Sequence, residues 1–228
     1  NMGIPRLTLL GFSPRTYPIL LELAADTWGL APEELRVRVV LNLPKPEPSD
    51  LDKLPAHWMP PNFCSLEEWE IEQETGIIMP GTMHEPAVSV VWDSIIRAKP
   101  GLKKTRLGVV AHPSAAIAPS AKIGNGTWIH PNVTVSSLSE VGFCCHLNRN
   151  SSLGHHNVLG DFSRLNPGAH TAGFCIIGSR TTIGIGAVCI EKISIGSRCM
   201  VGAAAVVVSD GLDHQQALGV PAKWRGRV

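Results

Sequence analysis

Large aliphatic residues in the second half of the chain recur every six positions, from Ile117 to Val207. The pattern continues through sixteen positions without a change of register, and fourteen of them hold Ile, Leu or Val. These positions are Ile117, Ile123, Ile129, Val135, Val141, Leu147, Leu153, Leu159, Leu165, Thr171, Ile177, Ile183, Cys189, Ile195, Val201 and Val207. A hexapeptide period predicts a parallel β-helix, in which three hexads form one triangular coil and the aliphatic side chains fill the interior.

A second series, mostly of small residues, lies two positions before each aliphatic residue. Glycine often follows the aliphatic residue directly, and we expect it to supply positive φ angles at the corners. These glycines are Gly124, Gly142, Gly154, Gly160, Gly178, Gly184, Gly196 and Gly202. Because one coil contains three hexads, residues eighteen positions apart should lie next to each other on successive coils.

The first part of the chain alternates between strand-like and helix-like patterns. Strands are predicted over residues 6–11, 36–42 and 76–79, and helices over residues 14–25 and 87–98. Ser65 and Glu68 have the spacing of a capping box, which predicts the start of another helix. Residues 43–61 are rich in proline and are predicted to form a long loop. The alternation predicts a small α/β domain of Rossmann-like type with a parallel sheet.

The Pro100-Gly101 pair marks a plausible domain boundary, so we expect an α/β domain over residues 1–105 and an all-β domain over 106–228. Ligands of open parallel sheets bind beyond the carboxyl ends of the strands. In the first domain these ends are predicted at residues 11–15, 42–45 and 80–82. The residues alone leave two interpretations open. A nucleotide binds at these ends, or residues 11–15 form only a turn.

Composition narrows the possible classes of protein. The chain has 228 residues and a formal net charge of +1, so its overall charge gives no reason to expect nucleic acid binding. The apolar segments are too short for a membrane span, and no signal peptide is expected. Four of the six cysteines fall on interior positions of the hexad pattern, and no CxxC pair occurs. Buried free thiols of this kind favour a cytoplasmic protein.

Polar residues are concentrated between His146 and Gly173, whereas the other coils have fewer of them. The eighteen-residue coil places His155 over Gly173 and His146 over Arg164, and it aligns Asn148 with His130 and Asn166. A histidine can accept a proton from an amine or hydroxyl nucleophile, and a glycine N–H can stabilise the oxyanion of a thioester under attack. This pair predicts acyl transfer, although any one of these polar residues could be an ordinary exposed side chain.

A metal site is the competing interpretation of this histidine-rich region. His130, His146, His155, His156 and His170 could in principle supply ligands. They fall in different columns of the coil pattern, however, and no carboxylate is placed to orient them as metal-bound histidines usually require. We therefore predict no metal site.

The stretch from Leu147 to Ser163, LNRNSSLGHHNVLGDFS, resembles the active-site coil of the bacterial PglD/NeuD-type sugar acyltransferases, in which it has the form LNTSSxIEHxCxIGDF. Pro167-Gly168-Ala169, Ala172-Gly173 and the terminal Gly219-Val220-Pro221-Ala222-Lys223 continue the resemblance, which covers about residues 108–228. The resemblance implies a left-handed β-helix, a homotrimer with active sites between neighbouring β-helices, and acetyl-CoA as the acetyl donor. It also implies a nucleotide-linked amino sugar as acceptor, often a UDP-4-amino sugar.

The resemblance also implies roles for individual residues. His155 falls on the general base, His156 lies beside it in the catalytic group, and Gly173 falls on the glycine whose N–H meets the thioester carbonyl. The expected substrate contacts are Asn148, Gly11, Ser13, Arg15, Asn42 and Arg164. The expected coenzyme A contacts are Gly173, Ile185, Ala203, Lys223 and Arg225.

Several features depart from the family pattern, among them Asn42-Leu43 in place of an acidic pair after the second strand and the proline-rich insertion at 43–61. Acidic residues usually flank the family histidine, whereas Gly154 and His156 stand in those places here. The glycine-rich first loop of the family is replaced by Gly-Phe-Ser-Pro-Arg at residues 11–15. The sequence thus predicts a cytoplasmic acetyl-CoA-dependent N-acetyltransferase for a nucleotide-linked amino sugar. A sugar O-acetyltransferase of the sialic acid type, or a nucleotide-sugar or coenzyme A-binding protein with weak turnover, are the alternatives.

Overall fold

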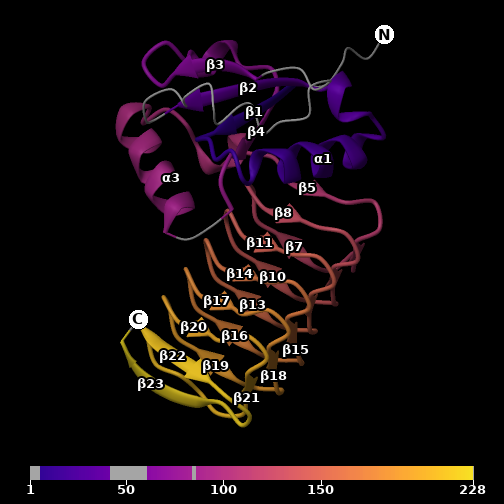
Figure 1. Ribbon diagram of the computed structural model, residues 1–228, viewed down its shortest axis with the longest axis vertical. Helices are drawn as coiled ribbons and strands as arrows, with labels where there is room; N and C mark the ends of the chain where they lie inside the picture. The colour runs from indigo at the N-terminus through magenta and orange to yellow at the C-terminus, as the bar shows by residue number, and fades with distance from the viewer. Residues whose placement is uncertain (1–5, 42–60, 84–85, 228) are drawn as a thin grey trace. The chain divides into compact units, whose positions relative to one another are not determined.

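The computed structural model describes residues 6–41, 61–83 and 86–227. The chain divides into two compact units, residues 1–110 and residues 111–228. The first unit combines strands and helices, and the second consists of short strands wound into coils (Figure 1). Among the described residues, no helix has the length and apolar character needed to cross a membrane.

The described part of the first unit consists of strands, α-helices and short 3-10 helices. These are β1 (Arg6–Leu10), α1 (Tyr17–Trp28), η1 (Pro32–Glu34), β2 (Arg36–Leu41), β3 (Asn62–Ser65), η2 (Ile71–Gln73), β4 (Ile77–Pro80), α3 (Ala87–Ala98) and η3 (Lys104–Arg106). The strands form one parallel sheet in the order β3-β2-β1-β4. Parallel strands require crossover connections, and α1 is the crossover between β1 and β2.

Strands β1, β2 and β4 confirm the three predicted strands, each to within a residue at its described ends. Helix α3 has the predicted bounds. Helix α1 begins three residues later than Pro14, because the carbonyl of Ser13 first accepts the N–H groups of Thr16 and Tyr17 in a turn. It ends at Trp28 and is followed by Gly29, whose φ of 65° gives the left-handed C-cap that favours glycine.

The helix predicted to start at Ser65 is wrong. Ser65 N–H donates to Glu68 Oε2 at 3.2 Å and Glu68 N–H donates to Ser65 Oγ at 3.2 Å, so the capping-box hydrogen bonds do form. They close a turn over residues 66–68 that is not followed by an α-helix, because no apolar helical period continues there. Ser65 instead ends β3, a strand that the sequence pattern did not predict. Most of the predicted loop at 43–61, like Asn42, lies outside the described residues.

The second unit is built from two-residue strands. They are β5 (Val110–Ala111), β6 (Ala116–Ile117), β7 (Lys122–Ile123), β8 (Trp128–Ile129), β9 (Thr134–Val135), β10 (Glu140–Val141), β11 (His146–Leu147), β12 (Ser152–Leu153), β13 (Val158–Leu159), β14 (Arg164–Leu165), β15 (His170–Thr171), β16 (Ile176–Ile177), β17 (Thr182–Ile183), β18 (Val188–Cys189), β19 (Ser194–Ile195), β20 (Met200–Val201) and β21 (Val206–Val207). They form three parallel sheets, which are the three sides of a β-helix (Figure 1).

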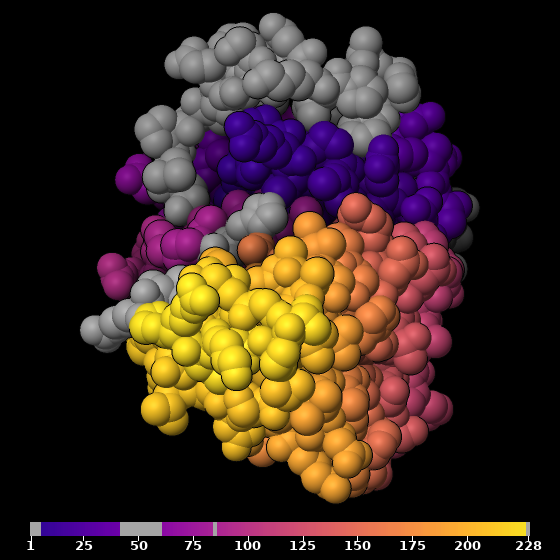
Figure 2. Space-filling view, turned by 60° about the horizontal axis from the view of Figure 1, so that its bottom comes forward, coloured from indigo at the N-terminus to yellow at the C-terminus, as the bar shows by residue number. Residues whose placement is uncertain are grey.

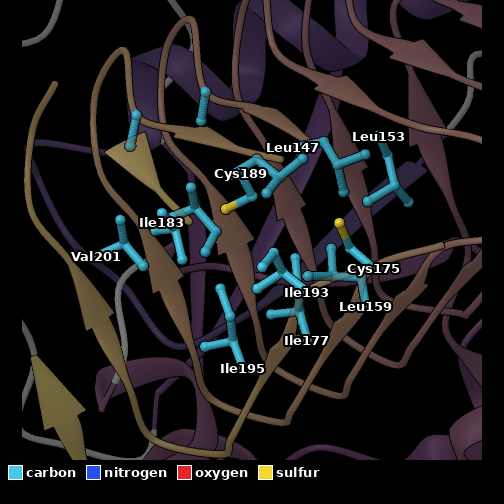
Figure 3. Packing of buried hydrophobic residues seen from close by; sticks show 14 of the residues in the cluster. Leu147, Leu153, Leu159, Cys175, Ile177, Ile183, Cys189, Ile193, Ile195 and Val201 are labelled. Carbon is cyan, nitrogen blue, oxygen red and sulfur yellow. The ribbon is translucent and has the colours of Figure 1, made fainter. Parts of the chain in front are cut away.

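Every aliphatic position predicted from the six-residue period is the second residue of one of the strands β6–β21. Paired strands are offset by eighteen residues, as in the pairing of Glu140 with Val158 and of Leu147 with Leu165. The side chains of the period fill the prism, and those of Leu147, Leu159 and Ile177 are at most 1% exposed (Figure 3). The predicted parallel β-helix and its register are therefore confirmed.

The expected role of the glycines that follow the aliphatic positions is wrong. These glycines do not have positive φ; the positive-φ corner residues, such as Asn150, His156 and Phe162, lie three positions after the aliphatic residue. A Cβ at Gly154 would instead clash with the backbone carbonyl of Ala172 on the next coil. Gly154 is needed because the two coils approach too closely at this position for a side chain.

Hydroxyl groups in the small-residue series tie the coils together. Ser163 Oγ donates to the carbonyl of Gly178 at 2.8 Å and accepts the N–H of Thr181 at 2.9 Å. Thr181 Oγ1 repeats the pattern one coil later, donating to Gly196 O at 2.8 Å and accepting from Cys199 N at 3.1 Å. These side chains are buried, and they satisfy corner backbone groups that no strand pairing reaches.

The chain closes the β-helix with a hairpin of β22 (Gln215–Leu218) and β23 (Lys223–Arg227). Strand β22 continues the sheet beside β20, and β23 pairs with it in the antiparallel direction. The hairpin lies at the surface beside the last coils (Figure 2). Lys223 and Arg225 are exposed there, so both cationic groups can reach an anion in solvent.

Candidate active site

The candidate site occupies one corner column of the β-helix. The corner that contains His155 follows β12, and the corner that contains Gly173 follows β15 on the next coil. The N–H of Phe174 donates to the carbonyl of His155 at 2.9 Å, which fixes one corner directly against the other. The structure therefore brings His155 and Gly173 together as the eighteen-residue period predicts.

The imidazole of His155 lies against the Cα of Gly173. A Cβ built on Gly173 would lie 2.5 Å from both Cε1 and Nε2 of His155 and 3.0 Å from its Nδ1. Real Cβ atoms do not approach other atoms so closely, so this ring position requires glycine at residue 173. The φ angle of Gly173 is not positive, and its role is therefore steric.

His156 is the immediate polar partner of His155. Their Nδ1 atoms are 3.1 Å apart, within hydrogen-bond distance, so one ring donates and the other accepts. His156 also stacks on Phe174, with ring centroids 4.7 Å apart and an angle of 18° between the planes. His155 contacts Phe174 edge-on, at 5.1 Å and 89°. These contacts hold both exposed imidazoles in defined orientations.

Asn157 supports this corner from inside the coil. Its side chain is fully buried, and its Nδ2 donates to Thr171 Oγ1 at 2.7 Å and to the Ala172 carbonyl at 2.9 Å. Its Oδ1 accepts the N–H of Cys175 at 2.7 Å. Asn157 thus forms hydrogen bonds with the backbone before and after Gly173. Thr171 Oγ1 also accepts the N–H of Gly154 at 3.2 Å. Sequence reasoning did not assign a role to Asn157, although an amide in a series of small residues was a usable signal.

Two other histidines form a buried pair that the sequence did not predict. Nε2 of His130 and Nε2 of His146 are 2.7 Å apart, and the two side chains are only 5% and 4% exposed. Burial, with smaller contributions from the charges of Arg149 and His112, lowers the pKa of His130 to about 4. His130 is therefore a neutral imidazole at physiological pH.

The other predicted residues of the coils lie in several places. Asn148 is half-buried, and its Oδ1 accepts the N–H of Arg149 at 2.8 Å. Arg164 pairs in register with His146, and its Nε donates to Thr182 Oγ1 at 3.2 Å. Ile185 and Ala203 are exposed on successive coils. The hydrogen bonds just described do not involve His155, so each of these residues remains a separate prediction.

The predicted residues of the first unit surround the carboxyl end of β1. Gly11 has a φ of 83°, which favours glycine, and its N–H donates to the Val40 carbonyl at 2.9 Å. Ser13 precedes α1 and caps its first turn through its carbonyl, and Arg15 is exposed. Asn42 lies outside the described residues. Within the described ranges, no group of three or more His, Cys, Asp or Glu side chains is arranged to hold a metal ion.

Comparison with known proteins gives matches at the level of structure. No family model matches the chain, and a search of curated proteins found no match. The acetyltransferase domain of PglB from Neisseria gonorrhoeae FA1090, solved with acetyl coenzyme A, superposes with a TM-score of 0.77 at 23% identity over 98% of this chain and 100% of that one.

Two further solved structures are similar over almost their whole length. PerB from Caulobacter crescentus, solved with CoA and GDP-perosamine, has a TM-score of 0.74 at 22% identity and covers 99% of both chains. WeeI from Acinetobacter baumannii AYE has a TM-score of 0.74 at 19% identity over 97% of this chain and 99% of that one. Each of the two units, over its described residues, has the fold of the corresponding part of these proteins.

Proposed function

We propose that this protein is an N-acetyltransferase that transfers the acetyl group of acetyl-CoA to the amine of a nucleotide-linked amino sugar. The observation that carries this proposal is the placement of the His155 imidazole directly against Gly173 on the neighbouring coil. A proton acceptor and a backbone N–H donor then meet at one point, as acyl transfer to an amine requires. The similarity of the fold to PglB and PerB, solved with acetyl coenzyme A and with CoA and GDP-perosamine, supports it.

In the proposed reaction the sugar amine attacks the thioester carbonyl carbon, and His155 Nε2 accepts the proton that the amine loses. The N–H of Gly173 donates to the oxyanion of the tetrahedral intermediate. Collapse of the intermediate breaks the carbon–sulfur bond, and the coenzyme A thiolate leaves and receives the proton from His155. The products are the amide and free coenzyme A, and no acyl-enzyme intermediate is needed.

His156 is proposed to take the orienting role of the missing carboxylate. If Nδ1–H of His155 donates to Nδ1 of His156, the lone pair of His155 is on Nε2, the atom next to Gly173. The stack on Phe174 holds the accepting ring in place. A histidine acceptor therefore fixes the tautomer that a general base needs, as a carboxylate does in catalytic triads.

The remaining assignments belong to the same proposal. Asn148, Arg164 and the segment from Gly11 through Ser13 to Arg15 would contact the nucleotide-linked sugar. The exposed Ile185, Ala203, Lys223 and Arg225 would contact coenzyme A. The proposal also includes a left-handed β-helix, a Rossmann-like first domain, a homotrimer and a cytoplasmic location. The strand order β3-β2-β1-β4 supports the Rossmann-like domain. Assays with both nucleotides distinguish UDP, which the sequence predicts, from GDP, which is bound in the PerB complex.

An acceptor panel tests the proposal. Coenzyme A release from acetyl-CoA would be measured with UDP-linked and GDP-linked 4-amino sugars and with free sialic acid, and the product identified by mass spectrometry. We expect an acetylated amine on a nucleotide-linked sugar. Acetylation of a hydroxyl on the free sugar would establish the O-acetyltransferase instead. Binding of a nucleotide sugar and coenzyme A without transfer would establish a binding protein with weak turnover, an alternative favoured by Gly154 and His156 in place of acidic residues.

A further inference from the structure

Arginine side chains gather at the amino edge of the first sheet, the edge opposite to Gly11 and Pro80. Arg6 opens β1 and Arg36 opens β2, and the two are register partners in the parallel pairing. Arg38 follows on the same face of β2 as Arg36, because side chains alternate between faces along a strand. Four residue steps along β1 separate Arg6 from the carboxyl end, a distance of roughly 13 Å. This edge is therefore distinct from the proposed nucleotide end.

These arginines line a cavity of about 330 Å³. Its described lining residues are Arg6, Thr8, Leu35, Arg36, Val37, Arg38, Asn62 and Glu74. The volume is at the small end of the range typical of ligand pockets. Among the described lining residues, three guanidinium groups and the single carboxylate of Glu74 leave two positive charges.

The carboxylate of Glu74 does not offset the charges of Arg6 and Arg36, because its oxygen atoms already accept hydrogen bonds from other groups. Oε2 accepts from Arg38 Nη1 at 3.0 Å and from the indole of Trp69 at 3.2 Å, and Oε1 accepts from the N–H of Gly76 at 3.1 Å. Burial opposes the charged form, but these donors, together with Thr8 and the charge of Arg38, lower the pKa of Glu74. The ion pair leaves Arg6 and Arg36 available to a ligand.

The hydroxyl of Thr8 is a second sign of a binding site. Thr8 is 1% exposed and lines the cavity, and its Oγ1 completes no hydrogen bond of good geometry despite its influence on Glu74. A buried hydroxyl whose hydrogen bond has poor geometry is incompletely satisfied, so a ligand atom that bonds to it would contribute to affinity.

An adjoining cavity of about 420 Å³ shares Arg6, Arg38 and Asn62 and adds Glu68 and Glu70 to the lining. The positive charge is therefore concentrated at the Arg36 end, and the other end offers hydrogen-bond acceptors. A ligand that fits both ends has an anionic group at one side and hydroxyl or amino groups at the other.

We propose that the amino edge of the first sheet binds the phosphate group of a small phosphate monoester that also carries hydroxyl or amino groups. The phosphate dianion matches the guanidinium groups of Arg6 and Arg36, neither of which is paired with Glu74, and guanidinium groups bind phosphate oxygens through paired N–H donors. The rest of the ligand extends toward Glu68 and Glu70. This site is independent of acetyl transfer and of the nucleotide end of the sheet.

Titration calorimetry on the full chain tests this site, with glucosamine phosphate and glycerol phosphate as probes and with glucosamine and citrate for comparison. We expect saturable binding of the phosphates with a Kd below about 1 mM. Arg6→Gln and Arg36→Gln should each raise that Kd at least tenfold. Arg97→Gln, an exposed arginine on α3, should leave it unchanged.

Circular dichroism would first establish that each variant is folded. Neither Arg6 nor Arg36 bonds to Glu74, and both are exposed, so both variants should fold. Absence of saturable phosphate binding, equal binding by the arginine variants, or stronger binding of citrate than of either phosphate would each overturn the proposal.

Discussion

The contact between His155 and Gly173 depends on two properties of single residues. Glycine at 173 leaves room for the ring, and Phe174 next to it provides the surface on which His156 stacks. The sequence predicted the contact because the coil length fixes which residues are neighbours. It could not predict the bond between His155 and His156, since that depends on the side-chain rotamers and on the positive φ of His156.

Substitution Gly173→Ala should disable the site without unfolding the coil. The added Cβ would lie 2.5 Å from the His155 ring, which is exposed and can rotate away. Displacement of a catalytic group by about 1 Å can lower the rate on the order of 100-fold. We therefore expect kcat/KM for acetyl transfer to fall by that order while the melting temperature changes little. Gly101→Ala, where no atom lies within 4 Å of the added carbon, is the matched control.

Two substitutions at His156 separate orientation from packing. His156→Ala removes the acceptor for His155 Nδ1, and we expect kcat to fall about tenfold or more. Alanine tolerates this kind of corner, as Ala204 with a φ of 55° shows, so the fold should persist. His156→Asp restores an acceptor and should recover much of the lost kcat. Equal kcat values for the Asp and Ala variants in steady-state assays would contradict the orienting role.

At the scale of elements, the period in the second unit predicted almost every strand, because each interior position accepts only a narrow range of side chains. The first unit was less predictable. Strand β3 and the turn at 66–68 have no periodic pattern, and local hydrogen bonds of the capping box formed in a turn instead of a helix. The His130–His146 pair also escaped prediction, because its members are sixteen positions apart rather than eighteen.

The histidine pair should make stability depend on pH. Burial lowers the pKa of His130 from 6.5 to about 4, so between these values the unfolded chain binds a proton that the folded chain does not. Stability is therefore unaffected above pH 6.5 and is lost as the pH falls toward 4, by up to about 3 kcal/mol.

Urea unfolding between pH 7.5 and 4.5 measures this contribution. We expect the His130→Leu variant to lose stability less steeply than the wild type as the pH falls, and His214→Asn, at a corner with positive φ, to follow the wild-type curve. If the His130→Leu and wild-type curves have the same slope, the buried neutral histidine is not the cause.

At the scale of the whole molecule, the β-helix presents an apolar strip to solvent. Val158 and Ile176 are register partners on β13 and β16, 40% and 55% exposed, and Phe174 beside them is 47% exposed. Such a strip on a protein surface is typical of an interface. In the proposed homotrimer, contact between neighbouring β-helices would bury this strip.

Analytical ultracentrifugation tests the trimer. Three chains of 24.5 kDa give about 73.5 kDa, which we expect for the wild type. Ile176→Glu would place a charge in the strip and should shift the protein toward the monomer, whereas Val90→Glu, on the exposed face of α3, should leave the mass unchanged. A monomeric wild type would contradict this assembly.

The central claim is that His155 is the general base of acetyl transfer to a nucleotide-linked amino sugar. Its most direct test is the kcat of wild type and His155→Ala with acetyl-CoA and the best acceptor of the panel, measured at saturating substrates on folded protein. Removal of a general base lowers the rate by about 100- to 10,000-fold, and we predict a loss within this range with little change in coenzyme A binding. A His155→Ala enzyme that transfers acetyl groups at the wild-type rate would contradict the account.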